Sequence, residues 1–408
     1  MKFDLDAYRK KPVPLKLIGT VQHYPWGGYQ FIPSLIHHPN DSRKPYAELW
    51  FGAHHAAPSK VFDRYGSIPL DQLISKAPVE ILGTNVIERF GERLPFLLKI
   101  LDAREMLSIQ VHPNKQQAEA GFAGENQRGI PLDAPQRIYK DDNHKPEVQV
   151  ALSDFWMLHG FRPLEEIKAL LTLVPECHSL LLALSSLGIE GLYRKIMTAP
   201  QAEIGSLLKP LIERLNRINP QDKDNPEYWV LKATQIFPDS HVDRGIFSIY
   251  LMNLLSLHPG DSTFQGAGVP HAYLQGATVE LMANSDNVLR GGLTKKFIQV
   301  DPLLETIKYE GQKPEITGGK KQKNGITVFP TPVEDFELSR LDLRKGKTYS
   351  AAAIPSPQIT FILHGGITIY SKKPSLDITR GMAFFAPANV EYKVEATENT
   401  VLYNARVP

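Results

Sequence analysis

The sequence has almost no cysteine: Cys177 is the single one among 408 residues. An intramolecular disulfide is therefore excluded, and a metal site built from several thiolates is excluded as well. Low cysteine usage fits a reducing compartment, so we expect a cytoplasmic protein. Any bound metal ion must use histidine, carboxylate or amide side chains.

An excess of charge of either sign is also missing. There are 46 basic and 44 acidic residues, which gives a net charge of +2. This balance gives no reason to expect nucleic acid or an anionic membrane as a partner. The most apolar stretch, "SLLLALSSLGIEGLY", is shorter than the ~20 residues that span a bilayer, and the first residues have no signal-peptide core. The oligomeric state is left open between a monomer and a small homo-oligomer.

The middle of the chain has helical periodicity. Apolar residues between 204 and 218 recur at spacings of three and four, and "PLEEIKALLTLV" and "NPEYWVLKATQIF" also read as amphipathic helices. Pro210 interrupts the first pattern and is expected to kink it or to start a new helix. We therefore predict a helical insert over residues 159–239, with polar residues that form a solvated face.

Strand patterns dominate on both sides of this block. Short apolar runs such as "LPFLLKIL" and "LSIQV" precede it, "IFSIYLMNLLSLHPGD" (246–261) follows it, and "PVEILGTNVIERFG" (78–91) is a helical exception. After a charged, glycine-rich linker at 317–325, turns recur every 8–12 residues, as in a sandwich or barrel. We predict a mainly β fold with two related barrels, one formed by residues 1–158 and 240–318 and the other by 319–408.

The stretch "SIQVHPNK" carries the first chemical signal. Alternate residues of a strand share a face, so Ser108, Gln110 and His112 would point one way and apolar residues the other. Gln110 and His112 would then be close enough to bind one metal ion together. For this stretch alone, a hydrogen-bonded histidine beside a turn is the commoner explanation.

Two further stretches carry polar groups of the same kind. In "HKPEVQVAL" strand alternation puts Glu147 on the face opposite the valines, and a buried carboxylate needs a partner. In "GVPHAYLQGATVELMANSDNVLRGGLTKK", His271 lies in a glycine-rich loop, with Arg290 downstream suited to a carboxylate or phosphate. On its own, a glutamate after proline is far more often a surface residue, and the last stretch alone could equally be a solvated, charged turn. Taken together, Gln110, His112, Glu147 and His271 form a nitrogen and oxygen set that suits a divalent metal, Zn²⁺ above all.

These motifs, with "YPWGG" and "PYAELWFGAH" near the start, resemble the type I phosphomannose isomerases. The matching segments run in order from about residue 20 to 300, and the last 90 residues carry no sharp motif. The resemblance implies an enzyme of two cupin-like jelly-roll barrels with one zinc ion, which interconverts mannose 6-phosphate and fructose 6-phosphate through an enediolate. The discontinuous domain of residues 1–158 and 240–318 would be catalytic, and the barrel of residues 319–408 would hold no metal. It places the family's metal ligands on the same four residues, Gln110, His112, Glu147 and His271.

The resemblance also assigns roles to other residues. Catalytic candidates are Arg290, Lys145, Glu280 and His144; substrate-binding candidates are Ser108, Tyr273, Asp286 and Lys296. Glu280 and Lys145 are the leading candidates for the base, His144 is possible, and Arg290 would stabilise charge because a guanidinium does not deprotonate.

Two departures from the family pattern concern the end of this segment. Thr294-Lys295-Lys296 replaces the usual Thr-Pro-Lys, which leaves open which lysine meets the phosphate, and Gly291 stands where alanine is frequent. The competing hypotheses are an isomerase of another phosphosugar, an iron dioxygenase cupin and a sugar-binding metal cupin without turnover. A dioxygenase has no need for the paired basic residues, and a binding protein needs no acid–base group.

Overall fold

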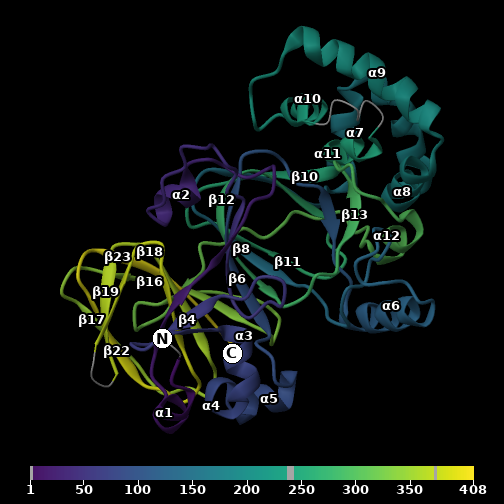
Figure 1. Cartoon of the computed structure of the whole chain (residues 1–408). Helices are drawn as coiled ribbons and strands as arrows, with labels where there is room; N and C mark the ends of the chain where they lie inside the picture. Colours follow the sequence, from purple (N-terminus) through teal and green to yellow (C-terminus); the bar gives the residue numbers. More distant parts are fainter. Residues whose placement is uncertain (1–2, 237–242, 372–374) are drawn as a thin grey trace.

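The computed structural model describes residues 3–236, 243–371 and 375–408, whose strands form three antiparallel sheets. The central region, here called the central barrel, contains β2 (Thr20–Gln22), β3 (Glu48–Phe51), β6 (Phe96–Ala103), β7 (Ile109–Val111), β8 (Glu147–Ala151), β9 (Phe155–Phe161), β10 (Met252–Leu257), β11 (Ser262–Gln265), β12 (His271–Ala283) and β13 (Leu289–Gly292). It occupies the middle of the molecule, with a helical region on one side and a second β unit on the other (Figure 1).

That second unit, the C-terminal barrel, is made of a nine-stranded and a four-stranded sheet. The larger sheet contains β1 (Leu15–Ile18), β4 (Lys60–Phe62), β5 (Ser67–Pro69), β14 (Lys320–Lys321), β15 (Thr327–Phe329), β16 (Glu337–Leu343), β18 (Gln358–His364), β21 (Ala383–Ala386) and β23 (Thr400–Arg406). The smaller sheet contains β17 (Thr348–Ala351), β19 (Gly366–Tyr370), β20 (Leu376–Thr379) and β22 (Tyr392–Ala396). The predicted mainly β fold with a helical region is confirmed.

Strand pairing links the two ends of the chain. Leu15 of β1 pairs with Phe385 of β21, and β4 and β5 extend the same sheet. One hydrophobic core also crosses between the barrels, because Phe51 of β3 packs on Phe361 of β18 with ring centroids 5.2 Å apart. The segment 1–158 therefore supplies strands to both barrels. The domain boundaries themselves stay a prediction.

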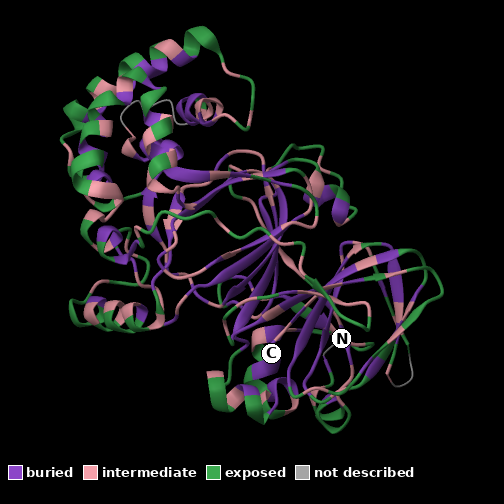
Figure 2. Cartoon of the chain, turned by 180° about the vertical axis from the view of Figure 1, so that it is seen from behind, coloured by how far each residue is buried: buried purple, intermediate pink, exposed green. Residues whose placement is uncertain are grey.

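The helical region covers one end of the central barrel (Figure 1). It contains α7 (Leu164–Thr172), η1 (Pro175–Cys177), α8 (His178–Thr198), α9 (Gln201–Ile218) and α10 (Pro226–Ile236), while residues 237–239 of the predicted insert lie outside the described residues. The inner faces of these helices are buried and their outer faces are exposed (Figure 2). A single helix, α9, runs through Pro210, so a new helix does not start there. No helix of the described residues is long and apolar enough to cross a membrane.

The remaining helices lie at the edges of the two barrels. They are α1 (Leu5–Lys10), α2 (Phe31–Leu35), α3 (Leu70–Lys76), α4 (Pro78–Leu82), α5 (Thr84–Phe90), α6 (Lys115–Gln127), η3 (Arg244–Phe247), α11 (Ser248–Leu251) and α12 (Val300–Thr306). The helix predicted over 78–91 is present as α4 and α5, broken at Gly83, whose positive φ of 79° ends the first segment.

Two local predictions were wrong. The strand predicted over 246–261 begins only at Met252, because η3 and α11 precede it; the Asp243 side chain accepts a hydrogen bond from the Gly245 N–H and starts these turns. The linker predicted over 317–325 contains a strand, since Lys320 and Lys321 pair with β15. In both cases the contacts of the folded chain set the secondary structure, which local composition did not specify.

The bend in β12 determines the geometry of the central barrel. Its first half pairs with β7 and β9, and its second half with β6 and β8. The corner is Gly276, at φ 120°, where a Cβ would lie 2.5 Å from the Asp154 carbonyl oxygen. Only glycine fits this position. One strand thus brings His271 and Glu280 to the same enclosed space.

Candidate metal centre

Three predicted ligands meet in a buried cluster. His112 follows β7, Glu147 begins β8 and His271 begins β12. His112 Nε2 lies 3.4 Å from Glu147 Oε1, and His271 Nε2 lies 3.2 Å from Glu147 Oε2. All three side chains are at most 4% exposed, and their ligand atoms lie within 4.8 Å of one another. This arrangement can hold a metal ion.

The orientation of both histidines fits metal binding. His112 Nδ1 lies 2.7 Å from the Asn287 carbonyl oxygen, and His271 Nδ1 lies 3.0 Å from the Val269 carbonyl oxygen. When each Nδ1–H donates to its carbonyl, both Nε2 lone pairs face Glu147; histidines that bind a metal commonly donate their other ring N–H to a carbonyl in this way. His112 Nε2 is buried and makes no hydrogen bond within the described chain, so a cation would satisfy it.

Gln110 completes the predicted set. It lies on β7, where it pairs across strands with His271 of β12 and with Arg290 of β13. Residues directly opposite one another in antiparallel strands share a face. Gln110 also lines a cavity of about 60 Å³ together with Glu147 and His271. The structure therefore brings together the four residues that the sequence predicted as metal ligands.

The charges of the cluster suit a cation. Burial lowers the pKa of His112 to about 4, so its imidazole is neutral at pH 7 and free to bind metal. Burial alone would raise the pKa of Glu147, but Lys145 and His112 outweigh it and hold that pKa well below its usual value. Lys145 Nζ lies 3.3 Å from Glu147 Oε1. The cluster thus combines the ionised carboxylate of Glu147 with the neutral imidazole of His112.

A second buried network adjoins this cluster. Lys99 Nζ of β6 lies 3.5 Å from Glu48 Oε2 and 3.4 Å from Glu280 Oε2, and Tyr273 OH donates to Glu280 Oε1 at 2.7 Å. The Trp50 indole N–H donates to Glu48. Burial and the negative charge of Glu147 raise the pKa of Glu280. A raised pKa makes this carboxylate a stronger proton acceptor than an exposed one.

Lys99 and Glu48 were missed by the sequence analysis, although both line the cavity. Lys99 is the one charge inside the apolar run "FLLKIL", and a buried lysine needs a carboxylate partner. That signal was available, but the partner is set by strand register: Glu280 and Trp50 lie directly opposite Lys99. The position of His54 was missed in the same way. It lies 3.2 Å from Asp286, and these two residues with His55 form another group able to hold a metal ion.

Two of the predicted basic residues lie on the other side of Gln110. Arg290 lies on β13 directly opposite Gln110, and it lines a small cavity with Arg137, Phe297 and Gln299. Burial, followed by the charge of Arg290, lowers the pKa of Lys296, so the two cations are near each other. Neither side chain makes an ion pair within the described chain, whereas Lys295 already has an interaction of its own.

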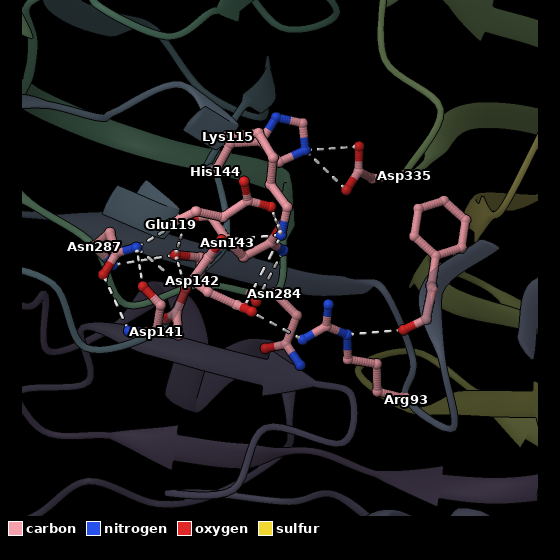
Figure 3. A network of polar contacts seen from close by, with 12 residues as sticks. Arg93, Lys115, Glu119, Asp141, Asp142, Asn143, His144, Asn284, Asn287 and Asp335 are labelled. Carbon is pink, nitrogen blue, oxygen red and sulfur yellow. Dashed lines mark hydrogen bonds and ion pairs between the residues drawn. The ribbon is translucent and has the colours of Figure 1, made fainter. Parts of the chain in front are cut away.

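His144 lies in a network of polar loop contacts (Figure 3), to which the Asp286 backbone N–H is joined by a 2.8 Å hydrogen bond to Asp141 Oδ2. The His144 ring points toward Asp335, with Nε2 3.0 Å from both carboxylate oxygens, and Asp335 belongs to the segment before β16 of the C-terminal barrel. The Asn287 side-chain amide donates to the Asn143 carbonyl at 2.8 Å. This bond holds Asn287 in place, and the backbone carbonyl of Asn287 is the one that orients His112. Ser108 is half-buried and precedes β7. The catalytic and substrate-binding roles of these residues stay predictions.

Comparisons with known proteins agree with this geometry. Residues 15–164 match the family model "Phosphomannose isomerase type I, catalytic domain". The mannose-6-phosphate isomerase of Escherichia coli (strain K12) is 38% identical over 92% of this chain and 95% of its own, and mannose-6-phosphate isomerase 1 of Arabidopsis thaliana is 32% identical over 95% and 92%. The crystal structure of the Salmonella typhimurium enzyme bound to fructose 6-phosphate and zinc superposes with a TM-score of 0.86 at 35% identity, covering 96% of this chain and 98% of that one. Similarity of this extent, together with the buried histidine–carboxylate cluster, shows that the chain belongs to the type I phosphomannose isomerase family.

Proposed function

We propose that this chain is a zinc-dependent aldose–ketose isomerase that interconverts mannose 6-phosphate and fructose 6-phosphate. The observation that carries the proposal is the buried cluster of His112, Glu147 and His271, with Arg290 on the neighbouring strand β13. Among the described residues, neither Arg290 nor the nearby Lys296 makes an ion pair. A metal centre beside a basic pocket fits a substrate with both hydroxyl oxygens and a phosphate. The zinc and fructose 6-phosphate bound by the Salmonella enzyme support the same assignment.

Gln110, His112, Glu147 and His271 would hold the zinc ion. When bound there, zinc supplies Lewis acidity that stabilises negative charge on nearby substrate oxygens. The remaining chemistry falls to the side chains of this chain. They must orient the sugar, exclude water and move one proton between carbon 2 and carbon 1 through an enediolate.

Glu280 is the base that the contacts favour. Its raised pKa makes it a better proton acceptor than an exposed carboxylate, and Lys99 and Tyr273 fix both of its oxygens. Lys145 Nζ, the other leading candidate, is already in an ion pair with Glu147, whereas a base needs a free lone pair. The third candidate, His144, has its Nε2 directed at Asp335.

The phosphate would be held by Lys296, with Arg290 between it and the metal centre. Lys296 is the better candidate than Lys295, which has an interaction of its own. Burial lowers the pKa of Arg290, yet a guanidinium keeps its charge at neutral pH and can stabilise an enediolate. Tyr273 and Asp286 would complete the sugar pocket, with Ser108 at its edge.

A coupled assay for fructose 6-phosphate formed from mannose 6-phosphate tests the proposal. The purified chain should turn over this substrate, lose activity on chelation and regain it when zinc alone is added back, with one zinc per chain by metal analysis. Failure of zinc to restore activity would contradict the zinc assignment. Turnover of a different phosphosugar, or sugar binding without turnover, would support the alternative functions. Oligomeric state and a cytoplasmic location stay predictions.

A further inference from the structure

The C-terminal barrel encloses a second cavity, far from the metal centre. Its volume is about 120 Å³, twice that of the cavity beside the metal cluster. A single water needs about 10–15 Å³ of such space, so this cavity has room for several waters or one small ligand. The yellow strands in Figure 1 form its wall.

One wall is a ladder of polar side chains on three adjacent strands. Across β16, β23 and β18, one row contains Glu337, Arg406 and Gln358, and the next contains Ser339, Asn404 and Thr360. Leu341 and Leu402 form a third row, which closes the apolar end against the core of this barrel. The inner face thus changes from polar to apolar along the strands.

The polar side chains of this wall form hydrogen bonds with one another, and some of their donor groups are left over. Asn404 Nδ2 donates to Thr360 Oγ1 at 2.7 Å and to Gln358 Oε1 at 3.3 Å, and Tyr392 OH donates to Gln358 Oε1 at 3.2 Å. No hydrogen bond of Gln358 Nε2 or Ser339 Oγ is found within the described chain, although both residues are less than 9% exposed. The Gln358 amide donor and the Ser339 hydroxyl, both in the cavity wall, are therefore available to a ligand.

The charge and shape of the cavity select the ligand class. Glu337 and Arg406 bond each other at 2.8 Å, so their charges cancel and a phosphate would meet the carboxylate. Amide and hydroxyl groups both donate and accept, as sugar hydroxyls do. Phe384, Tyr349 and Tyr392 line the cavity as well and offer apolar surface to a ring. Gln322 lines the cavity as well and is exposed, so the cavity opens to solvent at the turn between β14 and β15.

We propose that the cavity of the C-terminal barrel is a binding site for a neutral monosaccharide. The ring would lie against the aromatic side, with hydroxyl groups bonded to Gln358 and Ser339. This site is separate from the metal centre and does not depend on the proposed isomerase function. It gives the second barrel a ligand of its own without a metal ion.

Saturation-transfer NMR on the full zinc-loaded chain tests the proposal. D-mannose or D-glucose is the probe, and excess fructose 6-phosphate blocks the catalytic pocket. We expect transfer to a neutral hexose to persist under this block, and glycerol at the same concentration to give at least tenfold less signal. Loss of the hexose signal on adding fructose 6-phosphate, or an equal signal from glycerol, would overturn the proposal.

Matched variants locate the signal. Ser339→Leu fills the cavity and should abolish transfer, whereas Ser350→Leu, at an exposed position of β17 in the same barrel, should leave it unchanged. Isomerase turnover should stay at the wild-type rate in both, which also shows that they fold. If Ser339→Leu does not fold, Gln358→Met removes the free amide and should weaken binding at least tenfold. Wild-type transfer in the folded cavity variant would contradict the site.

Discussion

The central barrel and the C-terminal barrel are built on similar antiparallel strands and differ in the side chains that face inward. In the central barrel these are charged: Glu48, Lys99, Glu147 and Glu280 surround the histidines. In the C-terminal barrel they are mostly neutral amides, hydroxyls and aromatic rings. Neither histidine–carboxylate cluster of the described residues lies in the C-terminal barrel. The same architecture therefore serves charge stabilisation in one barrel and, as we propose, neutral recognition in the other.

The largest effect is expected from removing the base of the central barrel. Glu280→Gln keeps the shape and one acceptor for Tyr273 but cannot take a proton. We expect kcat for mannose 6-phosphate to fall on the order of 10²–10⁴-fold, with zinc content unchanged. Coupled-assay kinetics and metal analysis measure both. If Glu280→Gln retains full turnover while Lys145→Met loses it, Lys145 is the base.

A core substitution in the C-terminal barrel should lower the stability of the protein and leave catalysis unchanged. Phe361 is fully buried in the core that both barrels share. Phe361→Ala should lower the free energy of unfolding by about 3–5 kcal/mol, measured by urea denaturation, while kcat/KM is unchanged below the transition. The control is Tyr370→Ala on the exposed face of β19, where the loss should stay within about 0.5 kcal/mol. Equal effects of the two variants would show that Phe361 does not support a shared core.

The phosphate site gives a prediction of intermediate size. Lys296→Met should raise KM for mannose 6-phosphate about 10–100-fold with a smaller change in kcat, because a charge-assisted hydrogen bond contributes about 1.5–3 kcal/mol. Lys295→Met is the matched control and should change KM much less. Steady-state kinetics of both variants decide between adjacent lysines. The opposite order of effects would assign the phosphate to Lys295.

The sequence predicted some features of the two barrels and missed others. Strand alternation grouped Gln110 with His112 and placed Glu147 inward, and the glycine-rich loop drew attention to His271, because these signals are local. The resemblance then placed the family's ligands on the same four residues. Lys99 and Glu48 escaped, since their contacts depend on the register of strands that are separate in the chain. The addition of β1 to the C-terminal sheet escaped for the same reason. Local pattern specifies which face a residue takes, and only the fold specifies its opposite neighbour.

A pH profile probes the charged inner face. The Lys99 cation lowers the pKa of Glu280, which burial and Glu147 raise. Lys99→Met should therefore raise that pKa further. A base acts in its ionised form, so the fall of kcat/KM on the acid side should move to higher pH than in the wild-type chain. Profiles measured at constant ionic strength test this, and a shift to lower pH would exclude Glu280 as the titrating base.

The smallest catalytic effect is expected where the two barrels touch. The His144 ring, 26% exposed, meets the Asp335 carboxylate, 8% exposed, and so ties the loop beside the metal centre to the C-terminal barrel. His144→Ala should lower the free energy of unfolding by about 1–3 kcal/mol, because it leaves a buried carboxylate without its partner. Turnover should fall far less than the ~10² expected for loss of a general base.

A double-mutant cycle separates the two roles of His144. If its role is to join the barrels, His144→Ala and Asp335→Ala lose stability non-additively, since each removes the same contact. A catalytic role would instead make His144→Ala slow turnover by 10² or more while Asp335→Ala remains active. Asp335 lies before β16, outside the metal centre, so its substitution tests the contact without touching a metal ligand. Coupling in stability with little loss of turnover would mean that the C-terminal barrel supports the catalytic loop mechanically.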